Sequence, residues 1–502
     1  HLLTSSPKMC SICGIVGHHE QGALEKMMDS LAHRGPDDKG SFVSDDVELG
    51  HNRLSIIDTS SNGRQPMSNE NGSLWITFNG EIYNFVELRR ELEKSGRKFR
   101  SQTDTEVILS LYESEGLDFL HKLEGMFALG IYDQNNDRLV LARDRVGIKP
   151  LYYSTSGGTL RFASEAKALL LKQPTELSDL SLDDFFGRDG TAFIGVEELS
   201  PGELLVVEGG QLRKRQYYEL RENAVPETQA DIINHLACLI ESSVVQRLVS
   251  DRSIGIYFSG GLDSSLLASI AKTHYGNSLI GYCVGTSEIN EFEQARKTGN
   301  NLGFEVVTIE LSPSDIVYAI PKVIFHLEDC DPRNVEFGVM HYFLSLEAAK
   351  RDVRVVLSGE GADELFGGYD NRYDKERFTP KELVARMHYN HLKTQDRCSM
   401  ANAVEVRVPF LDDTRLLEFA LGLPPELRED KFVLREVARR DLAPEVAQRR
   451  KGYGHVRSGI PQIMNAYFGF ESGGTLQKRF DVYKRVFERI FQNGEDYRSI
   501  SL

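Results

Sequence analysis

Short apolar segments alternate with turns along the first third of the chain. Three of them are rich in leucine, β-branched and aromatic side chains, which is typical of strands: residues 74–78, 127–132 and 138–142. Apolar positions at helical spacing predict three helices, at residues 22–33, 84–96 and 105–115. Strands and helices in separate blocks predict a layered sheet domain packed between helices.

The pattern changes at about residue 229, where strands and helices begin to alternate. An amphipathic helix is expected over residues 229–249, and another helix at 290–302. Near-continuous apolar runs predict four strands, at residues 253–258, 279–284, 305–309 and 353–357. Such strands, separated by helices, predict a parallel α/β sheet covered on both faces. Ligands of such sheets bind beyond the carboxyl ends of the strands.

The length of the chain requires several domains, because 502 residues are too many for one hydrophobic core. A hairpin-like passage at residues 203–211 lies between the two patterns. We therefore divide the chain into four parts: an N-terminal domain (10–190), a bridging region and linker (191–228), a second domain (229–470) and a C-terminal tail (471–502).

Charge and cysteine usage narrow the class of protein. The formal net charge of −16 argues against broad binding to nucleic acid or to an anionic membrane. No apolar run approaches the ~18 residues of a membrane span. Six scattered cysteines indicate reduced thiols in a cytoplasmic protein rather than a disulfide framework. Residues 1–8 lack the features of a signal peptide, and we interpret them as an expression remnant or an upstream extension.

The strand at 253–258 leads into a candidate anion site. Residues 259–265 read SGGLDSS, which predicts a glycine turn that opens a helix. Glycines let the backbone approach an anion, the free N–H groups at the helix start face it, and the serine hydroxyls add donors. Asp263 can hold the Mg²⁺ that accompanies a polyphosphate. The segment is not a Walker loop, because no Lys-Ser or Lys-Thr pair follows the glycines. The alternative is a serine- and glycine-rich turn without a ligand.

A second glycine loop follows the strand at 353–357. Residues 358–369 read SGEGADELFGGY. Taken alone, an acidic glycine loop is also compatible with a solvated turn or a Ca²⁺ site. Because both loops follow strands of the predicted parallel sheet, we expect them at the same edge of that sheet.

The segment MCSICG at residues 9–14 resembles the start of class II glutamine amidotransferase domains. Six further motifs follow in the order of that family: HRGPD at 33–37, RLSIID at 53–58, NGEIYN at 79–84, TD at 103–104, and the segments 143–153 and 163–169. The resemblance implies a layered α-β-β-α fold of the N-terminal nucleophile type.

The resemblance also implies the roles of single residues. Cys10 becomes the first residue and attacks the carboxamide of glutamine, while its own α-amine accepts the thiol proton. Asn79 and the backbone N–H of Gly80 form the oxyanion hole. The side chains implied to bind glutamine are Arg53 for the α-carboxylate and Glu81 and Asp104 for the α-ammonium.

The cysteines and histidines of these motifs also allow other interpretations. Cys10 and Cys13 have the spacing of a redox pair or half a zinc site, but no second Cys/His pair lies nearby in the sequence. His33 and His51 lie in motifs where the family uses no histidine base, so we interpret both as structural. Cys10 does not begin the chain as given, and an amide nitrogen cannot act as the base. We therefore expect residues 1–9 to be removed, or the domain to be inactive.

The two loops of the second domain together resemble the synthetase domain of the asparagine synthetase family, and the resemblance covers roughly residues 9–465. It implies that ATP and Mg²⁺ are bound, with Asp263 and Asp363 as joint ligands of the metal. Glu360 would handle protons during ammonia attack, and Lys451 would offset phosphate charge. The residues expected to bind ATP and pyrophosphate are Ser259, Gly260, Gly261, Asp263, Ser264, Ser265, Ser358 and Gly359.

The resemblance implies amide synthesis: glutamine supplies ammonia, ATP adenylates L-aspartate, and asparagine, AMP and pyrophosphate are released. The expected partners are therefore these small molecules, and a homodimer is compatible with the sequence. An amide, β-lactam or peptide-cyclising ligase on the same scaffold is the first alternative, and a non-catalytic glutamine or nucleotide sensor is the second. The segment at 328–336 departs from the family, as does 454–458, which keeps the acceptor acid open.

Two further pairs of residues carry weaker hypotheses. Arg333 and Glu336 are candidates for binding the α-groups of an amino-acid acceptor. His388 and His391 have the spacing of metal ligands, but without a third ligand we interpret them as an exposed helix face.

Overall fold

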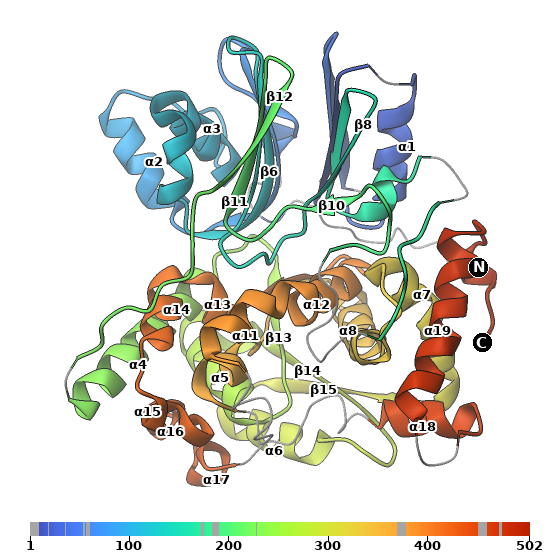
Figure 1. Cartoon of the computed structure of the whole chain (residues 1–502). Helices are drawn as coiled ribbons and strands as arrows, with labels where there is room; N and C mark the ends of the chain where they lie inside the picture. The colour runs from blue at the N-terminus through green and yellow to red at the C-terminus, as the bar shows by residue number, and fades with distance from the viewer. Residues whose placement is uncertain are drawn as a thin grey trace.

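The computed structural model describes residues 10–18, 20–35, 37–53, 56, 61–171, 175–182, 190–226, 228–368, 378–449, 459–470 and 474–502. Figure 1 shows two domains, a layered N-terminal domain above an α/β domain. Within these ranges, none of the helices combines the length and the apolar character needed to cross a bilayer.

The N-terminal domain contains two six-stranded antiparallel sheets. In spatial order, the first sheet contains β10 (Glu197–Glu198), β8 (Tyr152–Ser156), β9 (Thr159–Ala163), β1 (Ser11–Val16), β3 (Val47–Arg53) and β2 (Asp38–Val43). The second contains β12 (Gln211–Gln216), β11 (Glu203–Glu208), β7 (Arg138–Arg143), β6 (Gly125–Asp133), β5 (Leu74–Ile82) and β4 (Met67–Ser68).

Helices cover the outer face of each sheet, as the expected α-β-β-α layers require (Figure 1). The helices are α1 (Ala23–Ser30), α2 (Phe85–Lys94) and α3 (Asp104–Glu115). Apolar side chains of α1 pack with those of β1, and those of α2 and α3 pack with β5 and β6. A third cluster fills the space between the sheets and includes Ile12, Leu141 and Phe162. The layered fold is confirmed.

The second domain is built on a parallel five-stranded sheet, as predicted. Its strands are, in spatial order, β15 (Glu305–Leu311), β14 (Ile280–Thr286), β13 (Ser253–Tyr257), β16 (Val353–Leu357) and β17 (Glu405–Arg407). Every residue of β16 is buried, as the near-continuous apolar run at 353–357 predicts for a strand covered on both faces. The loops that follow β13 and β16 leave neighbouring strands at the same edge of the sheet.

Helices make up most of the rest of this domain. Those that cover the sheet or follow its strands are α4 (Gln229–Gln246), α5 (Leu262–Tyr275), α6 (Phe292–Leu302), α7 (Pro313–Leu327), α8 (Pro332–Lys350), α9 (Ala362–Phe366) and α12 (His391–Met400). The others are α11 (Pro380–Arg386), α13 (Pro409–Asp412), α14 (Thr414–Leu421), α15 (Pro425–Arg428), α16 (Phe432–Ala438), α17 (Pro444–Ala447), α18 (Ile460–Tyr467) and α19 (Thr475–Phe491).

The bridging region and the tail both pack onto the domains. Strand β10 pairs with β8 and strand β11 with β7, so part of the segment 191–228 extends the N-terminal sheets. The C-terminal helix α19 buries Phe480 and Phe487 in a cluster with residues of α7 and α8. In Figure 1 this helix runs along one side of the second domain. The division of the chain at residues 190, 228 and 470 stays a prediction.

Candidate functional site

One pocket of the N-terminal domain brings together the six residues that the sequence assigned to glutamine. The pocket is open to solvent and has a volume of about 470 Å³. Its lining includes Cys10, Arg53, Asn79, Gly80, Glu81 and Asp104. These residues come from β3, β5, the start of α3 and the residue before β1, so the pocket lies where the two sheets approach one another.

Strand β5 supplies an unusual buried amide to this pocket. The Asn79 side chain is 1% exposed, and within the described ranges neither its Nδ2 nor its Oδ1 has a hydrogen-bond partner. Leaving such a group unpaired costs about 1–3 kcal/mol, so the fold holds it in place for a ligand. At the next position only glycine fits, because a Cβ on Gly80 would lie 2.1 Å from the carbonyl oxygen of Met126. An amide donor and a free backbone approach are the features that an oxyanion site needs.

Asp104 opens helix α3 and faces the same pocket. The Thr103 side chain caps the helix by accepting the N–H of Glu106, which fixes the first turn. One Asp104 oxygen accepts the N–H of Ile82 at 3.0 Å. Burial raises the pKa of Asp104 to about 6. A cationic ligand beside this carboxylate would offset that cost and favour its ionised form.

Glu81 lies in the same pocket and accepts a hydrogen bond from a residue of the second domain. The Arg407 guanidinium donates to a Glu81 carboxylate oxygen at 2.9 Å, and both side chains are buried. Burial still raises the pKa of Glu81 well above its usual range, although Arg407 opposes the shift. Glu81 and Asp104 are thus two buried carboxylates in one pocket, an arrangement that suits a site for a substrate ammonium.

The second domain contributes one wall of this pocket, which the sequence did not predict. Glu405 of β17 lines the pocket. Its carboxylate accepts the Arg407 Nε at 2.9 Å and the Lys149 Nζ at 3.3 Å. The resemblance covers this part of the chain but implies no role for Glu405 or Arg407. The glutamine pocket is therefore completed by a strand of the other domain.

The backbone of Cys10 is also tied to the second domain. Arg34 is fully buried, and its Nε donates to the carbonyl oxygen of Cys10 at 3.4 Å. The same guanidinium pairs with Glu165 at 2.7 Å and with Asp396 of α12 at 2.9 Å. Arg397 of α12 pairs with Glu165 at 3.2 Å. A buried ionic cluster thus joins the candidate nucleophile to helix α12.

In the second domain, strand β13 leads into helix α5 through the predicted glycine turn. Gly260 has φ +70°, and a Cβ there would lie 3.0 Å from the Ala295 backbone. Helix α5 begins after Gly261 without a side-chain cap, an arrangement that is compatible with an anion at its first N–H groups. The hydroxyl oxygens of Ser259 and Ser264 lie 3.4 Å apart at this turn, whereas Ser265 is fully buried in the helix.

The loop after β16 packs directly onto this turn. A Cβ on Gly359 would lie 3.1 Å from Asp263 Cβ and 3.4 Å from the Ser264 backbone nitrogen. The Ser358 backbone N–H donates to the carbonyl oxygen of Arg407, which ties the loop to β17. The two loops that the sequence placed at one edge of the sheet are therefore in contact.

The two predicted metal ligands share a lysine that the sequence did not indicate. Lys431 Nζ lies 2.7 Å from each carboxylate oxygen of Asp263 and also pairs with Asp363. Lys431 is 4% exposed and lies 168 positions from Asp263, so no local pattern could reveal the contact. Carboxylate oxygens that converge on one cation are the donors that Mg²⁺ prefers, so this donor set fits the metal.

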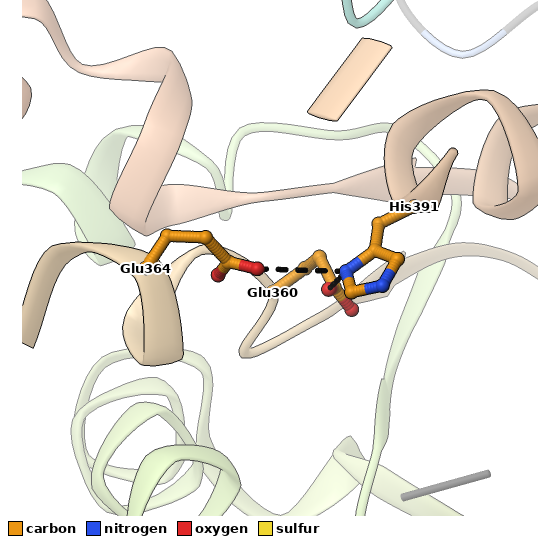
Figure 2. Close-up of side chains that lie close together, drawn as sticks. All are labelled: Glu360, Glu364 and His391. Carbon is orange, nitrogen blue, oxygen red and sulfur yellow. Dashed lines mark ion pairs between the residues drawn. The ribbon is translucent and has the colours of Figure 1, made fainter. Parts of the chain in front are cut away.

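Glu360 is held by helix α12 (Figure 2). His391 Nδ1 lies 2.8 Å from one carboxylate oxygen, and Gln395 Nε2 donates to the other at 3.3 Å. Glu364 also approaches His391 Nδ1, at 3.5 Å. The prediction that His388 and His391 form an exposed helix face is wrong. His388 is 4% exposed, and His391 faces two carboxylates that are distant in sequence.

The predicted Lys451 lies outside the described residues. Arg449, two positions before it, donates to the carbonyl oxygen of Gly260 at 3.5 Å and pairs with Glu291 at 2.7 Å. A cation therefore lies beside the glycine turn, two positions before the lysine that the resemblance assigns to phosphate charge.

Arg333 and Glu336, predicted to bind the α-groups of the acceptor amino acid, pair with other side chains of this chain. Glu336 is 2% exposed and accepts hydrogen bonds from Arg479 and Tyr483 of α19. These contacts fasten the C-terminal helix to α8. Arg333 pairs with Asp331, two residues before it, at the start of α8.

Two family models match the chain. The model of the glutamine amidotransferase domain matches residues 9–218, and the model of asparagine synthase matches residues 235–386 and 381–470.

Named relatives span both domains. A glutamine-hydrolysing asparagine synthetase of Bacillus subtilis is 36% identical over 75% of this chain and 61% of its own length. One from Arabidopsis thaliana is 31% identical over 96% of this chain and 88% of its own. The asparagine synthetase B of Escherichia coli is 31% identical over 96% of this chain and 91% of its own.

Proposed function

Because the chain belongs to the family of glutamine-hydrolysing asparagine synthetases, we propose that it converts L-aspartate into L-asparagine with ammonia taken from glutamine. ATP is split to AMP and pyrophosphate in the same reaction. One observation carries the proposal: the pocket of Cys10 is completed by Glu405 of the domain that holds the two nucleotide loops. Both sites therefore belong to one assembled unit.

The first half-reaction takes place in the pocket around Cys10. The Cys10 sulfur attacks the carboxamide carbon of glutamine, and the free α-amine of the same residue takes the thiol proton. Asn79 Nδ2 and the Gly80 N–H donate to the oxyanion of the tetrahedral intermediate. Ammonia leaves, and water then hydrolyses the glutamyl thioester. This chemistry requires that the bond between residues 9 and 10 has been cut.

Glutamine is recognised by its α-groups. The Arg53 guanidinium binds the α-carboxylate through its fork of donors. Asp104, with Glu81, accepts the α-ammonium, and the raised pKa of each carboxyl is lowered when that cation binds. The α-groups of glutamine therefore meet three buried side chains of opposite charge.

The second half-reaction takes place between the two contacting loops. The N–H groups at the start of α5, with Ser259 and Ser264, bind the phosphates of ATP. Asp263 and Asp363 would hold Mg²⁺, which neutralises phosphate charge. The aspartate side-chain carboxylate attacks the α-phosphorus, and pyrophosphate leaves. Ammonia then attacks the acyl carbon, AMP leaves, and Glu360 accepts the proton that the nitrogen loses.

Ammonia must reach the second site before it is protonated, since ammonium is not a nucleophile. Cys10 packs against a hydrophobic cluster that also contains Met400 and Val408 of the second domain. This continuity supports transfer through a sheltered, apolar boundary between the domains. Lys451 stays a prediction for offsetting phosphate charge.

Location and assembly are also proposals. All six cysteines are free, which agrees with a reducing cytoplasm. A homodimer stays a prediction, and neither nucleic acid nor a membrane is expected as a partner. A β-lactam-forming or peptide-cyclising ligase is not favoured, because the named relatives that match most of the chain are asparagine synthetases.

The test is product analysis with enzyme whose chain begins at Cys10. Glutamine, Mg-ATP and either aspartate or another carboxylic acid are supplied, and amino acids and nucleotides are quantified. We expect asparagine and AMP in a one-to-one ratio with aspartate. AMP formed only with a different acid would refute the assignment of the acceptor, and ADP in place of AMP would refute the mode of ATP cleavage.

A further inference from the structure

Two side chains of helix α12 contact the carboxylate of Glu360, one at each oxygen. His391 Nδ1 lies 2.8 Å from Oε1, and Gln395 Nε2 lies 3.3 Å from Oε2 and 2.7 Å from the Ser358 hydroxyl. His391 and Gln395 are four positions apart, so both project from the same face of the helix. Figure 2 shows the carboxylates of Glu360 and Glu364 both approaching Nδ1 of this imidazole.

Glu360, Glu364 and His391 also have the composition of a metal site, and their ligand atoms lie within 4.8 Å of one another. Two ligands of one tetrahedral zinc ion, each at ~2.0–2.1 Å, lie roughly 3.3 Å apart. The nitrogen of His391 is closer than that to Glu360, at the distance of a charge-assisted hydrogen bond. The geometry therefore favours an ion pair over a shared metal.

The charges around His391 support a stable imidazolium. Burial by itself lowers the pKa of His391, but Glu360 and Glu364 raise it to about 10. The third titratable neighbour, His341 of α8, is buried, and burial lowers its pKa to about 4, so it stays neutral. Phe337 packs its ring 4.5 Å from that of His341 and 5.4 Å from that of His391, which shields one side of the pair from water.

We propose that His391 is a positioning residue for Glu360, whose imidazolium fixes the carboxylate and keeps it ionised until ammonia attacks. The nitrogen forms its bond to the acyl carbon, the bond to AMP breaks, and the released proton goes to Glu360 and then to water. His391 neither gains nor loses a proton in the step. The inference deepens the proposed function, because it rests on the assignment of Glu360 as the proton acceptor.

The kinetic test compares His391→Asn, which keeps a neutral donor near Nδ1, with His391→Lys, which keeps the charge. With ammonium as nitrogen donor, we expect His391→Asn to lower kcat by roughly 10- to 100-fold. The KM for ATP stays within about twofold of the native value, and the acid limb of the pH profile moves up by about one pH unit. We expect His391→Lys to recover part of kcat and to return the acid limb of the pH profile to its native position. Glutamine hydrolysis is unchanged in both variants.

His274 offers a matched control, since its Nε2 pairs with Glu241 at 3.0 Å on the surface of the same domain. His274→Asn should change none of these values. An unchanged kcat in His391→Asn, or a lower kcat with an unmoved acid limb and no recovery by lysine, would overturn the proposal. So would activity that is lost after chelation and restored by Zn²⁺ or Mn²⁺ but not by Mg²⁺.

A second measurement does not depend on catalysis. In histidine-labelled enzyme, the NMR signal of His391 is assigned by its loss in His391→Asn. We expect this signal to stay that of an imidazolium up to about pH 8, and its midpoint to fall by at least about one unit in Glu360→Gln. A midpoint near 6.5 in the native enzyme would refute the ion pair. Failure of native enzyme to make asparagine, with the expected NMR result, would instead refute the proposed reaction.

Discussion

Replacing Asn79 by alanine should separate activity from stability. The Asn79 amide is buried in the glutamine pocket, and both its polar atoms lack partners within the described ranges. The change therefore removes no hydrogen bond from the free enzyme. It does remove the proposed donor to the oxyanion of the glutaminase reaction.

The expected magnitudes follow from these two facts. Loss of one oxyanion donor lowers the rate of glutamine hydrolysis by about 10²–10³, or ~2.7–4 kcal/mol. Deleting a buried amide that is unpaired relieves a cost of about 1–3 kcal/mol, which offsets the small cavity that alanine leaves. The free energy of unfolding should thus be unchanged or up to about 2 kcal/mol higher.

Asn52 is the matched control in the same domain. It is 2% exposed, and its amide donates to Ser11 at 3.0 Å and to the Met28 carbonyl at 2.9 Å. Asn52→Ala should therefore lower the free energy of unfolding by about 1–3 kcal/mol. The assays are glutamate release, ammonium-driven asparagine synthesis and urea unfolding. If Asn79→Ala releases glutamate at a rate within tenfold of the native enzyme, Asn79 is not the oxyanion donor. If it loses as much stability as Asn52→Ala, its amide is not unpaired in the free enzyme.

Cys10→Ala should abolish glutamine-dependent synthesis and leave ammonium-driven synthesis intact, whereas Cys13→Ala keeps both, because burial raises the pKa of the Cys13 thiol; loss of activity in Cys13→Ala alone would reverse the assignment. Asp263→Asn should lower pyrophosphate release at least about 100-fold with little change in glutamate release, and undiminished pyrophosphate would refute its role with the metal. Glu198 is buried; burial alone would raise its pKa, but Arg143 and His388 lower it from 4.5 to about 2. A lowered pKa in the folded state stabilises above pH 4.5, so about 3 kcal/mol of unfolding free energy is lost between pH 4.5 and 2. Glu198→Gln should flatten this loss in acid unfolding, unlike Glu197→Gln at the surface, and equal acid curves would contradict it.

The parts of the fold that the sequence predicts are those with an unambiguous apolar run. The segment at 353–357 coincides with β16 because four of its five side chains are apolar and all five residues are buried in the sheet. Strand β3 was not predicted, since Glu48, His51 and Asn52 interrupt its apolar pattern. These polar residues are tolerated because partners across the domain bond them, as Thr77 does for His51 at 3.1 Å. Tertiary contacts of this kind leave no local signal.

The candidate sites also divide into residues that the sequence can indicate and contacts that it cannot. Asn79 and Asp263 stand in motifs whose residue types are dictated by chemistry, so the sequence could indicate them. Arg407 reaches Glu81 across 326 positions, and Lys431 reaches Asp263 across 168. Neither pairing can be inferred from spacing, because it depends on how two domains and two loops meet.

The error over His391 has a specific cause. The spacing of His388 and His391 predicts one shared helix face, but His388 lies in the 3₁₀ helix Met387–Tyr389, whereas His391 begins α12 after Asn390. The carboxylates that face His391 come from the loop at 358–361 and from α9, about thirty positions earlier. His388 is therefore buried, and His391 is only partly exposed beside a charged loop.

The central claim is that one chain moves nitrogen from glutamine to aspartate. Enzyme that begins at Cys10 is given glutamine labelled with ¹⁵N at the amide, with aspartate and Mg-ATP, in a bath of unlabelled ammonium. Mass spectrometry then measures the label in asparagine against the AMP released. We predict that asparagine equals AMP and carries mostly ¹⁵N, because ammonia passes between the sites without mixing. Asparagine with the isotope content of the bath, or no asparagine beside hydrolysed glutamine, would contradict the account.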